Sequence, residues 1–564
     1  MVEPILPPVK VTDVTLRDGL EDFVQKHLRL DDLVRLASLL DRVGFYSVDC
    51  CGGATFYAAL NNLKEDPWEH LKRMRRALTS TPIQMILRGR MLVGFQPYDD
   101  EVVRRFMIRA AHLGVDIFRI YDTLNDLDNM ALAITTGKEL RKQVEATVVY
   151  SLSPHLTNED YLNLMSDLAN LGVDVLCLND SFGILNPAQV ASLVSAYRRY
   201  FHQPLRLHLH DSHQAAITSY LEGIRQGAAM VDTTVSALSW SYGPPPVESL
   251  MFSLGGSGHD PILNLDILGE VTEYLDSLKE KYHFRQPPPR QPDDRLSPSY
   301  LPGPLKEFIR EELQRRDARG RQQAAYKEAT QVWADLGHPA LKGRILEIVG
   351  LQAVENIMGA GPRYGNLIPI MLELLRGKYG RLHSPVKPEL QRRALAGEEA
   401  PGEEAPPQEG QLRGFPGLER EEDVLTYSLF PEEAEAYFYH RDRSPQAPPA
   451  AAPQAPGPYP ILTPFTHTDL TLTHKGEEVK ARLEGVGSGR KGRQVLFINI
   501  GDHIEEIEVQ LLPGEEDRPD FLVTLHGDTY RVRITQTLPK EQEYTPVFLE
   551  INGQVEEFLL KNSH

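Results

Sequence analysis

Short apolar runs alternate with amphipathic segments along the first half of the chain. Each run is rich in large apolar side chains and ends in polar or glycine residues. The intervening segments, such as 31–44 and 101–114, repeat apolar residues at the three- and four-residue spacing of one helix face. The runs are therefore predicted to be strands, and they span residues 9–16, 46–51, 83–89, 115–122, 145–151, 173–180, 205–211 and 230–238.

Eight strand-then-helix units predict an α/β fold, a closed (β/α)₈ TIM barrel, in residues 1–285. The runs are apolar on both faces, as expected of buried parallel strands. An open doubly wound sheet is the alternative, but no Gly-x-Gly-x-x-Gly motif follows the first run. The carboxyl ends of barrel strands meet at one rim, where this fold builds its active sites. The polar residues at or near these predicted ends are Asp18, Arg88, Asp122, Asn179, Asp180, His208 and His210.

Residues 286–441 are predicted to form a helical region after the barrel. A segment rich in Pro, Gly and Glu at 394–419 interrupts this region. Because such a segment buries little apolar surface, we expect it to be a solvated linker. Helical spacing of apolar residues occurs at 304–316, 324–337, 366–380 and 420–441.

The composition changes twice more toward the end of the chain. Residues 442–464 are rich in Pro and Ala, and we expect an extended linker there. Residues 465–564 alternate polar and apolar positions, and the pair Asn552-Gly553 is a strong signal for a hairpin turn. This last part is predicted to be a small all-β module.

Charge and cysteine content argue against several classes of protein. The 564-residue chain has 60 basic and 79 acidic residues, and its net charge of -19 disfavours binding to nucleic acid. Three cysteines are too few for a disulfide framework or a Cys-rich zinc site. No apolar run reaches the roughly 18 residues of a membrane helix, and the N-terminus has no signal-peptide pattern. We expect a cytoplasmic protein without direct membrane insertion.

His208 and His210 give the sharpest chemical signal. Residues two apart on a strand face the same side, so both imidazoles would project together. Two such imidazoles are natural ligands of a divalent metal, although two packed histidines at a barrel mouth would give the same pattern. Asp18 can reach the same ion because the first and seventh strands lie two apart around a closed barrel. The alternative roles of Asp18 are a helix cap or an ion pair with Arg17.

Five other residues admit a functional or a structural role. Arg88 suits the capture of a substrate carboxylate, and it suits a structural ion pair equally well. Asp122 and Asp180 could orient a ligand, but we favour helix or loop capping for both. Cys50 and Cys51 are expected to be buried thiols, because neighbouring cysteines rarely meet disulfide geometry.

Longer motifs resemble a known family. Over residues 9–440 the chain looks like the carboxyltransferase domain of biotin-dependent pyruvate carboxylases, oxaloacetate decarboxylase alpha subunits and transcarboxylase. In that family the helical region folds back and funnels the active site. The motifs that carry the resemblance are Thr15-Leu16-Arg17-Asp18, GGATF (52–56), EDPWE (65–69), LRG (87–89), VDIFRIYD (115–122), His208-Leu209-His210-Asp211, IVGLQAV (348–354), PVKPELQ (385–391) and EDVLTYSLFP (422–431).

The resemblance implies a divalent metal, such as Zn, Mn, Co or Mg, bound by Asp18, His208 and His210. The family's further ligand is a carbamylated lysine, and Asn179 stands at that position in this chain. Asparagine cannot be carbamylated, so the site loses a negative ligand. The resemblance thus predicts a metal centre with an altered set of ligands.

The resemblance also implies roles for three residues in catalysis. Arg88 would hold the substrate carboxylate, and Arg17 would help to close the pocket around the ion. Ser241 lies nearest to the family's proton-shuttling threonine. Four pocket positions depart from the family pattern, because a His, a Gln, a Trp and a Tyr are replaced by Leu20, Glu21, Cys51 and Phe95.

The implied function is a carboxyltransferase subunit that moves CO₂ between biotin and a small 2-oxo acid, pyruvate or oxaloacetate. No Met-Lys-Met biotin acceptor occurs in the sequence, although residues 521–537 resemble the start of a carrier domain. Biotin is therefore expected on a separate carrier protein. The other expected partners are a biotin carboxylase or membrane decarboxylase subunits, and further copies of this chain in a homo-oligomer.

Two other hypotheses remain open. Because several pocket positions differ together, the chain could be a degenerate paralogue that scaffolds an active complex. Segments 17–20 and 179–183 also resemble the hydroxymethylglutaryl-CoA lyase and isopropylmalate synthase barrels. Those barrels bind a metal through Asp and His-x-His without a carbamylated lysine, so a metal-dependent acyl-CoA lyase or aldolase is the third hypothesis.

Overall fold

The computed structural model describes two compact units, which lie within Met1–Pro445 and Gln446–His564. Among the described residues, no helix combines the length and the apolar character needed to cross a membrane. The residues described are 7–19, 27–151, 153–211, 214–239, 243–284, 301–359, 361–396 and 420–443, together with eight C-terminal strands.

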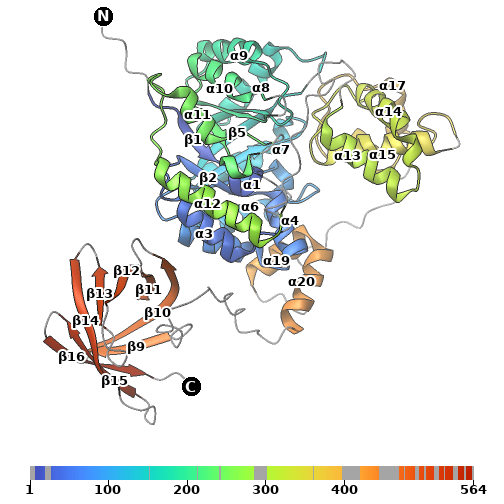
Figure 1. The fold of residues 1–564 in the computed structure, drawn as a ribbon. Coiled ribbons are helices and arrows are strands. Elements are labelled where there is room, and N and C mark those ends of the chain that lie inside the picture. Colours follow the sequence, from blue (N-terminus) through green and yellow to red (C-terminus); the bar gives the residue numbers. More distant parts are fainter. Residues whose placement is uncertain are drawn as a thin grey trace, which may run out of the picture. The chain divides into compact units, whose positions relative to one another are not determined.

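Eight parallel strands close into a barrel in the order of the chain, which confirms the predicted (β/α)₈ fold (Figure 1). The first strand pairs with both the second and the eighth, so the sheet has no open edge. The doubly wound alternative is therefore wrong. The strands are β1 (Lys10–Asp13), β2 (Ser47–Cys51), β3 (Ile83–Leu87), β4 (Ile117–Tyr121), β5 (Gln143–Val149), β6 (Val175–Asp180), β7 (Leu205–Leu209) and β8 (Met230–Thr233).

Helices follow the strands and pack around the outside of the barrel (Figure 1). Leu33, Leu36 and Leu40 show the helical spacing of the buried faces. The side chains of Thr157 and Asn186 accept hydrogen bonds from backbone N–H groups in the first turns of two helices, which fixes where those helices begin. The helices are α3 (Leu30–Leu40), α4 (Gly53–Ala58), α5 (Pro67–Ala77), α6 (Asp100–His112), α7 (Leu127–Glu139), α8 (Asn158–Asn170), α9 (Pro187–Tyr200), α10 (Ala216–Arg225), α11 (Val247–Leu254) and α12 (Leu265–Lys281).

The barrel interior carries a layer of paired charges, so the prediction of strands that are apolar on both faces is wrong for the inner face. Arg119 and Arg206 are buried, and each forms ion pairs with both Glu145 and Asp232. Two guanidinium groups and two carboxylates thus neutralise one another. A buried charge without a partner is costly, whereas a fully paired set is tolerated.

The helical region has an apolar core of its own. The helix over 344–358 was not predicted. The segment predicted at 366–380 is a regular helix only over 369–375, because Pro369 favours the first turn and Gly377 leaves the helix with a φ of 84°. The helices are α13 (Gly303–Arg315), α14 (Gln322–Asp335), α15 (Arg344–Met358), α16 (Pro369–Leu375) and α17 (Pro388–Leu395).

Two helices, α19 (Glu421–Leu429) and α20 (Pro431–Arg443), replace the single helical piece predicted at 420–441. The break falls at Pro431, whose nitrogen carries no hydrogen to continue the helical bonding. Most of the linker predicted at 394–419 lies outside the described residues.

Two long-range hydrogen bonds fix α19 to the barrel. The indole Nε1 of Trp68 donates to Oγ1 of Thr426 over 3.0 Å, and the hydroxyl of Tyr98 donates to the carbonyl of Leu429 over 2.9 Å. Both tyrosine and tryptophan are buried, so their polar atoms need these partners. The segment after the linker is therefore part of the barrel unit.

The C-terminal unit is a closed antiparallel barrel of eight strands, which confirms the predicted all-β module. Ile551 pairs with Gln554 across the last two strands, as expected of a hairpin that turns at Asn552-Gly553. The two turn residues and nearly all of the predicted linker 442–464 lie outside the described residues. The strands are β9 (Asp469–His474), β10 (Glu477–Ser488), β11 (Gln494–Ile500), β12 (His503–Leu512), β13 (Asp520–Leu525), β14 (Asp528–Thr537), β15 (Tyr544–Ile551) and β16 (Gln554–Lys561).

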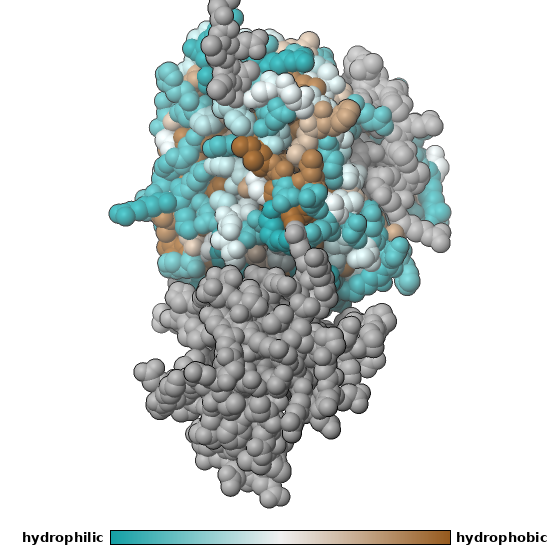
Figure 2. Space-filling view, turned by 60° about the vertical axis from the view of Figure 1, so that its left-hand side comes forward, coloured by the Kyte–Doolittle hydropathy of each residue, from teal (hydrophilic) through white to brown (hydrophobic). Residues whose placement is uncertain are grey.

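The outer surface of the barrel is mixed in character. Figure 2 shows one face, on which a small hydrophobic group lies among predominantly hydrophilic residues. Phe252 and Ile262 are among the large hydrophobic side chains that are exposed. Scattered apolar side chains are normal on a folded protein, and the main apolar surface lies between the strands and the helices.

Candidate functional site

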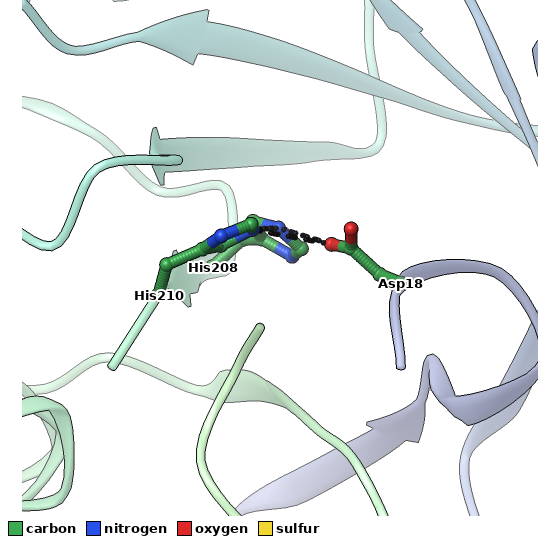
Figure 3. A group of neighbouring side chains, drawn as sticks. All are labelled: Asp18, His208 and His210. Carbon is green, nitrogen blue, oxygen red and sulfur yellow. Dashed lines mark hydrogen bonds and ion pairs between the residues drawn. The ribbon is translucent and has the colours of Figure 1, made fainter. Parts of the chain in front are cut away.

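His208 and His210 lie at the carboxyl end of β7, as the sequence predicted. His208 is opposite Asn179 of β6 in the parallel register. His210 follows the last residue of the strand, and its backbone N–H donates to the carbonyl of Asp180 over 3.0 Å. The two imidazoles face the same side, with 3.2 Å between their Nε2 atoms (Figure 3).

Asp18 lies on a single helical turn, α1 (Thr15–Asp18), and not on an extended strand. The first strand ends at Asp13, whose carboxylate accepts hydrogen bonds from the backbone N–H and the hydroxyl of Thr15. These bonds turn the chain, so the strand predicted over 9–16 is wrong over its last residues. The helical turn brings the Asp18 carboxylate to the histidine pair (Figure 3).

Three potential ligand atoms converge in this arrangement. Oδ2 of Asp18 lies 3.0 Å from Nε2 of His208 and 3.3 Å from Nε2 of His210. Ligands about 2.0–2.1 Å from a tetrahedral ion lie roughly 3.3 Å from one another. One carboxylate and two imidazoles are also a donor set that divalent metals accept. The residues present therefore fit a divalent metal ion.

Asp232 fixes the orientation of the His208 ring. Nδ1 of His208 donates to Oδ2 of Asp232 over 2.8 Å, so the lone pair of Nε2 points to the ligand cluster. Burial opposes ionisation of Asp232, but the charges of Arg119 and Arg206 hold its pKa well below the ordinary value. An ionised Asp232 keeps the Nδ1 proton on the ring.

The charge states of the other two ligands also suit a metal. Burial alone would raise the pKa of Asp18, but Arg17 and His210 hold that pKa well below its ordinary value. Burial lowers the pKa of His210, although Asp18 opposes this effect. An ionised carboxylate and a neutral imidazole are the forms that bind metal ions.

Arg17 lies between two carboxylates. Its Nη1 is 3.5 Å from Oδ1 of Asp18, and its Nη2 is 2.9 Å from Oδ2 of Asp49. A Cβ at Gly52 would lie 3.0 Å from Cδ of Arg17 and 2.7 Å from the Ile86 side chain. The glycine at 52 therefore allows this close approach beside the candidate centre.

Arg88 follows β3 and is half-buried. Its Nε donates to the hydroxyl of Tyr121 over 3.0 Å, and its Nη1 donates to the carbonyl of Gly94 over 3.3 Å. Within the described ranges, no carboxylate forms an ion pair with Arg88. Its described partners are neutral oxygens, so the positive charge is available to an anion at the rim.

Asn179 is buried and hydrogen-bonded within the protein. Its Oδ1 accepts a bond of 2.6 Å from the hydroxyl of Ser181, which in turn accepts a bond of 2.9 Å from Nζ of Lys342. Lys342 belongs to the segment between α14 and α15. A cation from the helical region therefore lies two hydrogen bonds away from the position of the family's carbamylated lysine.

Asp122 and Asp180 cap the loops that follow their strands, which confirms the structural interpretation. Asp122 accepts a hydrogen bond of 2.9 Å from the N–H of Leu124, and Asp180 accepts one of 2.7 Å from the N–H of Leu185. Burial raises the pKa of each carboxyl to about 6. Neither residue belongs to the cluster of candidate ligands.

Some of the predicted residues are not among those that the structure describes. Ser241, Leu20 and Glu21 lie outside the described ranges. Cys50 and Cys51 are buried free thiols with 3.6 Å between their sulfur atoms, as the sequence predicted.

The sequence analysis missed Tyr121, Asp232 and Lys342. Tyr121 lies two residues beyond Arg119 on the same strand, and that alternation could have placed it on the inner face. Asp232 interrupts an otherwise apolar run, which is a weak signal for an inward polar residue. Lys342 follows no predicted strand, so no local pattern indicates it.

Two family descriptions match successive parts of the chain. Residues 8–275 match the HMGL-like family, and residues 309–487 match the conserved carboxylase domain. The first match spans the barrel strands and most of the helices around them. The second begins in the helical region and ends in β10.

Similar proteins are known from several organisms. A pyruvate carboxylase subunit of Methanocaldococcus jannaschii is 35% identical over 436 residues, which cover 75% of this chain and 76% of that protein. The methylmalonyl-CoA carboxyltransferase 5S subunit of Propionibacterium freudenreichii subsp. shermanii is 29% identical over 519 residues, or 89% and 97% of the two chains. The carboxyl transferase domain of Rhizobium etli pyruvate carboxylase, solved with pyruvate, shares the fold with a TM-score of 0.71 at 23% identity, over 99% of this chain and 89% of that chain.

Proposed function

Because this chain belongs to the family of biotin-dependent carboxyltransferases, we propose that it is the carboxyltransferase subunit of a biotin-dependent enzyme. The proposed reaction moves CO₂ between biotin and pyruvate or oxaloacetate. The relatives whose names state a pyruvate carboxylase subunit or a carboxyltransferase subunit support this substrate class.

The observation that carries the proposal is the convergence of Asp18, His208 and His210 on one point of the rim. Arg88 follows another strand of the same rim, so a cation for a substrate carboxylate accompanies the ligand cluster. A metal site and a carboxylate site side by side are what a 2-oxo acid needs, because its carbonyl and carboxylate are adjacent.

Each residue contributes a distinct physical effect. A divalent metal bound by the cluster would supply Lewis-acid polarisation of the 2-oxo group and so favour enolate formation. Arg88 binds the substrate carboxylate, and the hydroxyl of Tyr121 orients its guanidinium. Asp232 holds His208 in the tautomer that presents Nε2 to the cluster.

A proton must pass between N1 of biotin and C3 of pyruvate when the carboxyl group moves. By resemblance, we propose that a hydroxyl near Ser241 carries this proton. We also propose that biotin is bound to a separate carrier protein, since the chain has no Met-Lys-Met tripeptide. The further partners proposed are a biotin carboxylase or membrane decarboxylase subunits, and other copies of this chain.

Asn179 distinguishes this centre from that of the carbamylated relatives. Its amide offers a neutral oxygen, and that oxygen already accepts a hydrogen bond from Ser181. Asp18 is then the one negative ligand among the proposed four. We therefore expect weaker metal binding than in a centre with a carbamate.

The test is biotin-dependent decarboxylation of oxaloacetate by the purified protein with Mn²⁺ or Zn²⁺ and free biotin. We expect pyruvate formation that needs both biotin and metal and falls at least about 100-fold in Arg88→Ala. Arg90→Ala, which removes a surface partner of Asp100, is the matched control and should retain full activity. The proposal fails if the metal-loaded wild type shows no biotin-dependent decarboxylation.

A further inference from the structure

Lys342 reaches the rim of the barrel from the helical region. Its Nζ donates to the hydroxyl of Ser181 over 2.9 Å and lies 5.1 Å from the ring centroid of Tyr121. Ser181 follows β6, and Tyr121 ends β4. Lys342 therefore projects over the same part of the rim that carries the candidate active site.

Arg88 meets the same tyrosine. Its Nε donates to the hydroxyl of Tyr121, and its guanidinium carbon lies 5.9 Å from the ring centroid. The residue after Lys342 also packs on Arg88, because a Cβ at Gly343 would lie 3.6 Å from Nη2 of Arg88. Gly343 has a φ of 54°, which a larger side chain rarely adopts, so the backbone can pass this close to the guanidinium.

The two cations have mainly neutral partners. In the part of the chain that the structure describes, neither Arg88 nor Lys342 forms an ion pair with a carboxylate. Asp122 and Glu347 act on Arg88 at longer range, but their carboxylates are engaged elsewhere. Asp122 accepts backbone hydrogen bonds, and Glu347 pairs with Arg344 over 2.9 Å.

The hydroxyl of Tyr121 senses both positive charges. Burial alone would raise its pKa, but Arg88 and Lys342 hold that pKa below its ordinary value. Two half-buried cations that face one tyrosine create a strongly positive region. Such a region is favourable when an anion binds there and neutralises it.

We propose that Lys342 and Arg88 form a two-cation subsite that selects 2-oxo acids with two carboxylate groups over those with one. The inference rests on the proposed function in one respect, since it takes Arg88 as the residue that binds the first carboxylate. Lys342 binds the second carboxylate and so determines specificity. A monocarboxylic acid such as pyruvate leaves Lys342 with the hydroxyl of Ser181 as its partner.

Pairs of ligands that differ in one carboxylate test the subsite directly. Isothermal calorimetry on the full-length protein compares 2-oxoglutarate with 2-oxopentanoate, and oxaloacetate with 2-oxobutyrate, in the absence of biotin. A charge-assisted contact predicts that the wild type binds one dicarboxylate at least about tenfold more tightly than its monocarboxylate partner. The pair that shows the preference also reports the spacing of the two carboxylates.

Variants then assign the preference to Lys342. Lys342→Met should bind both members of the pair equally, with the affinity for the monocarboxylate within about twofold of wild type, whereas Lys342→Arg should keep the preference. Lys327→Met, at an exposed lysine of the same helical region, is the matched control and should behave as wild type. Lys342→Gln replaces Lys342→Met if the latter lowers the melting temperature.

The proposal is overturned if the wild type has no preference in either pair, or if Lys342→Met and Lys342→Gln retain it. These outcomes are independent of carboxyl transfer, because the measurement uses binding alone. A protein that shows the preference but no biotin-dependent decarboxylation contradicts the proposed function and leaves the subsite in place.

Discussion

The 2.8 Å hydrogen bond between Nδ1 of His208 and Oδ2 of Asp232 joins the candidate metal centre to the charged layer inside the barrel. Asp232 also accepts hydrogen bonds from Arg119 and Arg206. One carboxylate thus orients a metal ligand and neutralises two buried cations. The chemistry at the rim and the stability of the core depend on the same residue.

Asp232→Asn should therefore weaken both properties. Loss of this charge leaves Glu145 as the counter-ion of two buried arginines, and breaking a buried ion-pair network costs about 3–5 kcal/mol. Loss of the carboxylate partner of His208 should reduce metal affinity by roughly 10–100-fold. Urea unfolding and metal titration measure the two effects. Asp276→Asn, in an exposed pair with Lys279, should change the unfolding free energy by no more than about 0.5 kcal/mol.

Asp13 should make the protein less stable as the pH rises from about 4 to about 7. Burial raises the pKa of Asp13 to about 7, whereas the unfolded chain has the ordinary value of 3.8. In this window the folded state binds more protons than the unfolded state, so the unfolding free energy falls as the pH rises. Three pKa units correspond to about 4 kcal/mol at most.

The measurement compares unfolding free energies of wild type and Asp13→Asn at several pH values. The difference between the two proteins should change through this window and become constant above about pH 8, because other groups titrate in both. A constant difference from pH 4 to pH 8 would contradict the pKa of Asp13.

The sequence predicted the parts of the site that depend on local periodicity. His208 and His210 lie two residues apart on a strand, and alternation alone places both on one side. The position of Asp18 was predicted only in part, since the hydrogen bonds from Thr15 to Asp13 end the strand early. The closed barrel still brought the first and seventh strands close enough for Asp18 to reach the pair.

Contacts between distant segments were not predictable from these patterns. Arg119 pairs with Asp232 across 113 residues, and Lys342 reaches Ser181 across 161 residues. A periodicity argument treats each charged residue in a strand as unfavourable, because it cannot see the partner. The helix over 344–358 was missed for a related reason: it is largely apolar and buried in the separate core of the helical region, so its polar face is short.

His210→Ala should abolish stoichiometric metal binding. The variant removes one of three ligand atoms that lie within 4.8 Å of one another, and the remaining pair cannot hold an ion tightly. Elemental analysis of the purified proteins after dialysis against a weak chelator measures the metal content. His259→Ala, at a histidine on the surface of the barrel unit, should retain the wild-type content. A wild type without stoichiometric metal would refute the candidate centre.

Asn179→Lys should restore a negative ligand when CO₂ is present. Asn179 is opposite His208 in the strand register, so a lysine there starts from the same inner face of the barrel. Reaction of its amine with CO₂ gives a carbamate, whose negative charge would attract both the metal and the nearby ammonium group of Lys342. By analogy with a charged hydrogen-bond partner, the gain is about 1.5–3 kcal/mol, or roughly 10–100-fold in metal affinity.

The gain must depend on bicarbonate, since an uncarbamylated lysine brings a positive charge next to Lys342 and the ion. Metal titrations of Asn179→Lys with and without bicarbonate measure this dependence. Asn179→Met has a chain of similar length that cannot be carbamylated, and it should respond to bicarbonate no more than wild type does. Equal metal affinities of Asn179→Lys under the two conditions would mean that residue 179 does not reach the ion, and that this centre uses a set of ligands unlike that of its carbamylated relatives.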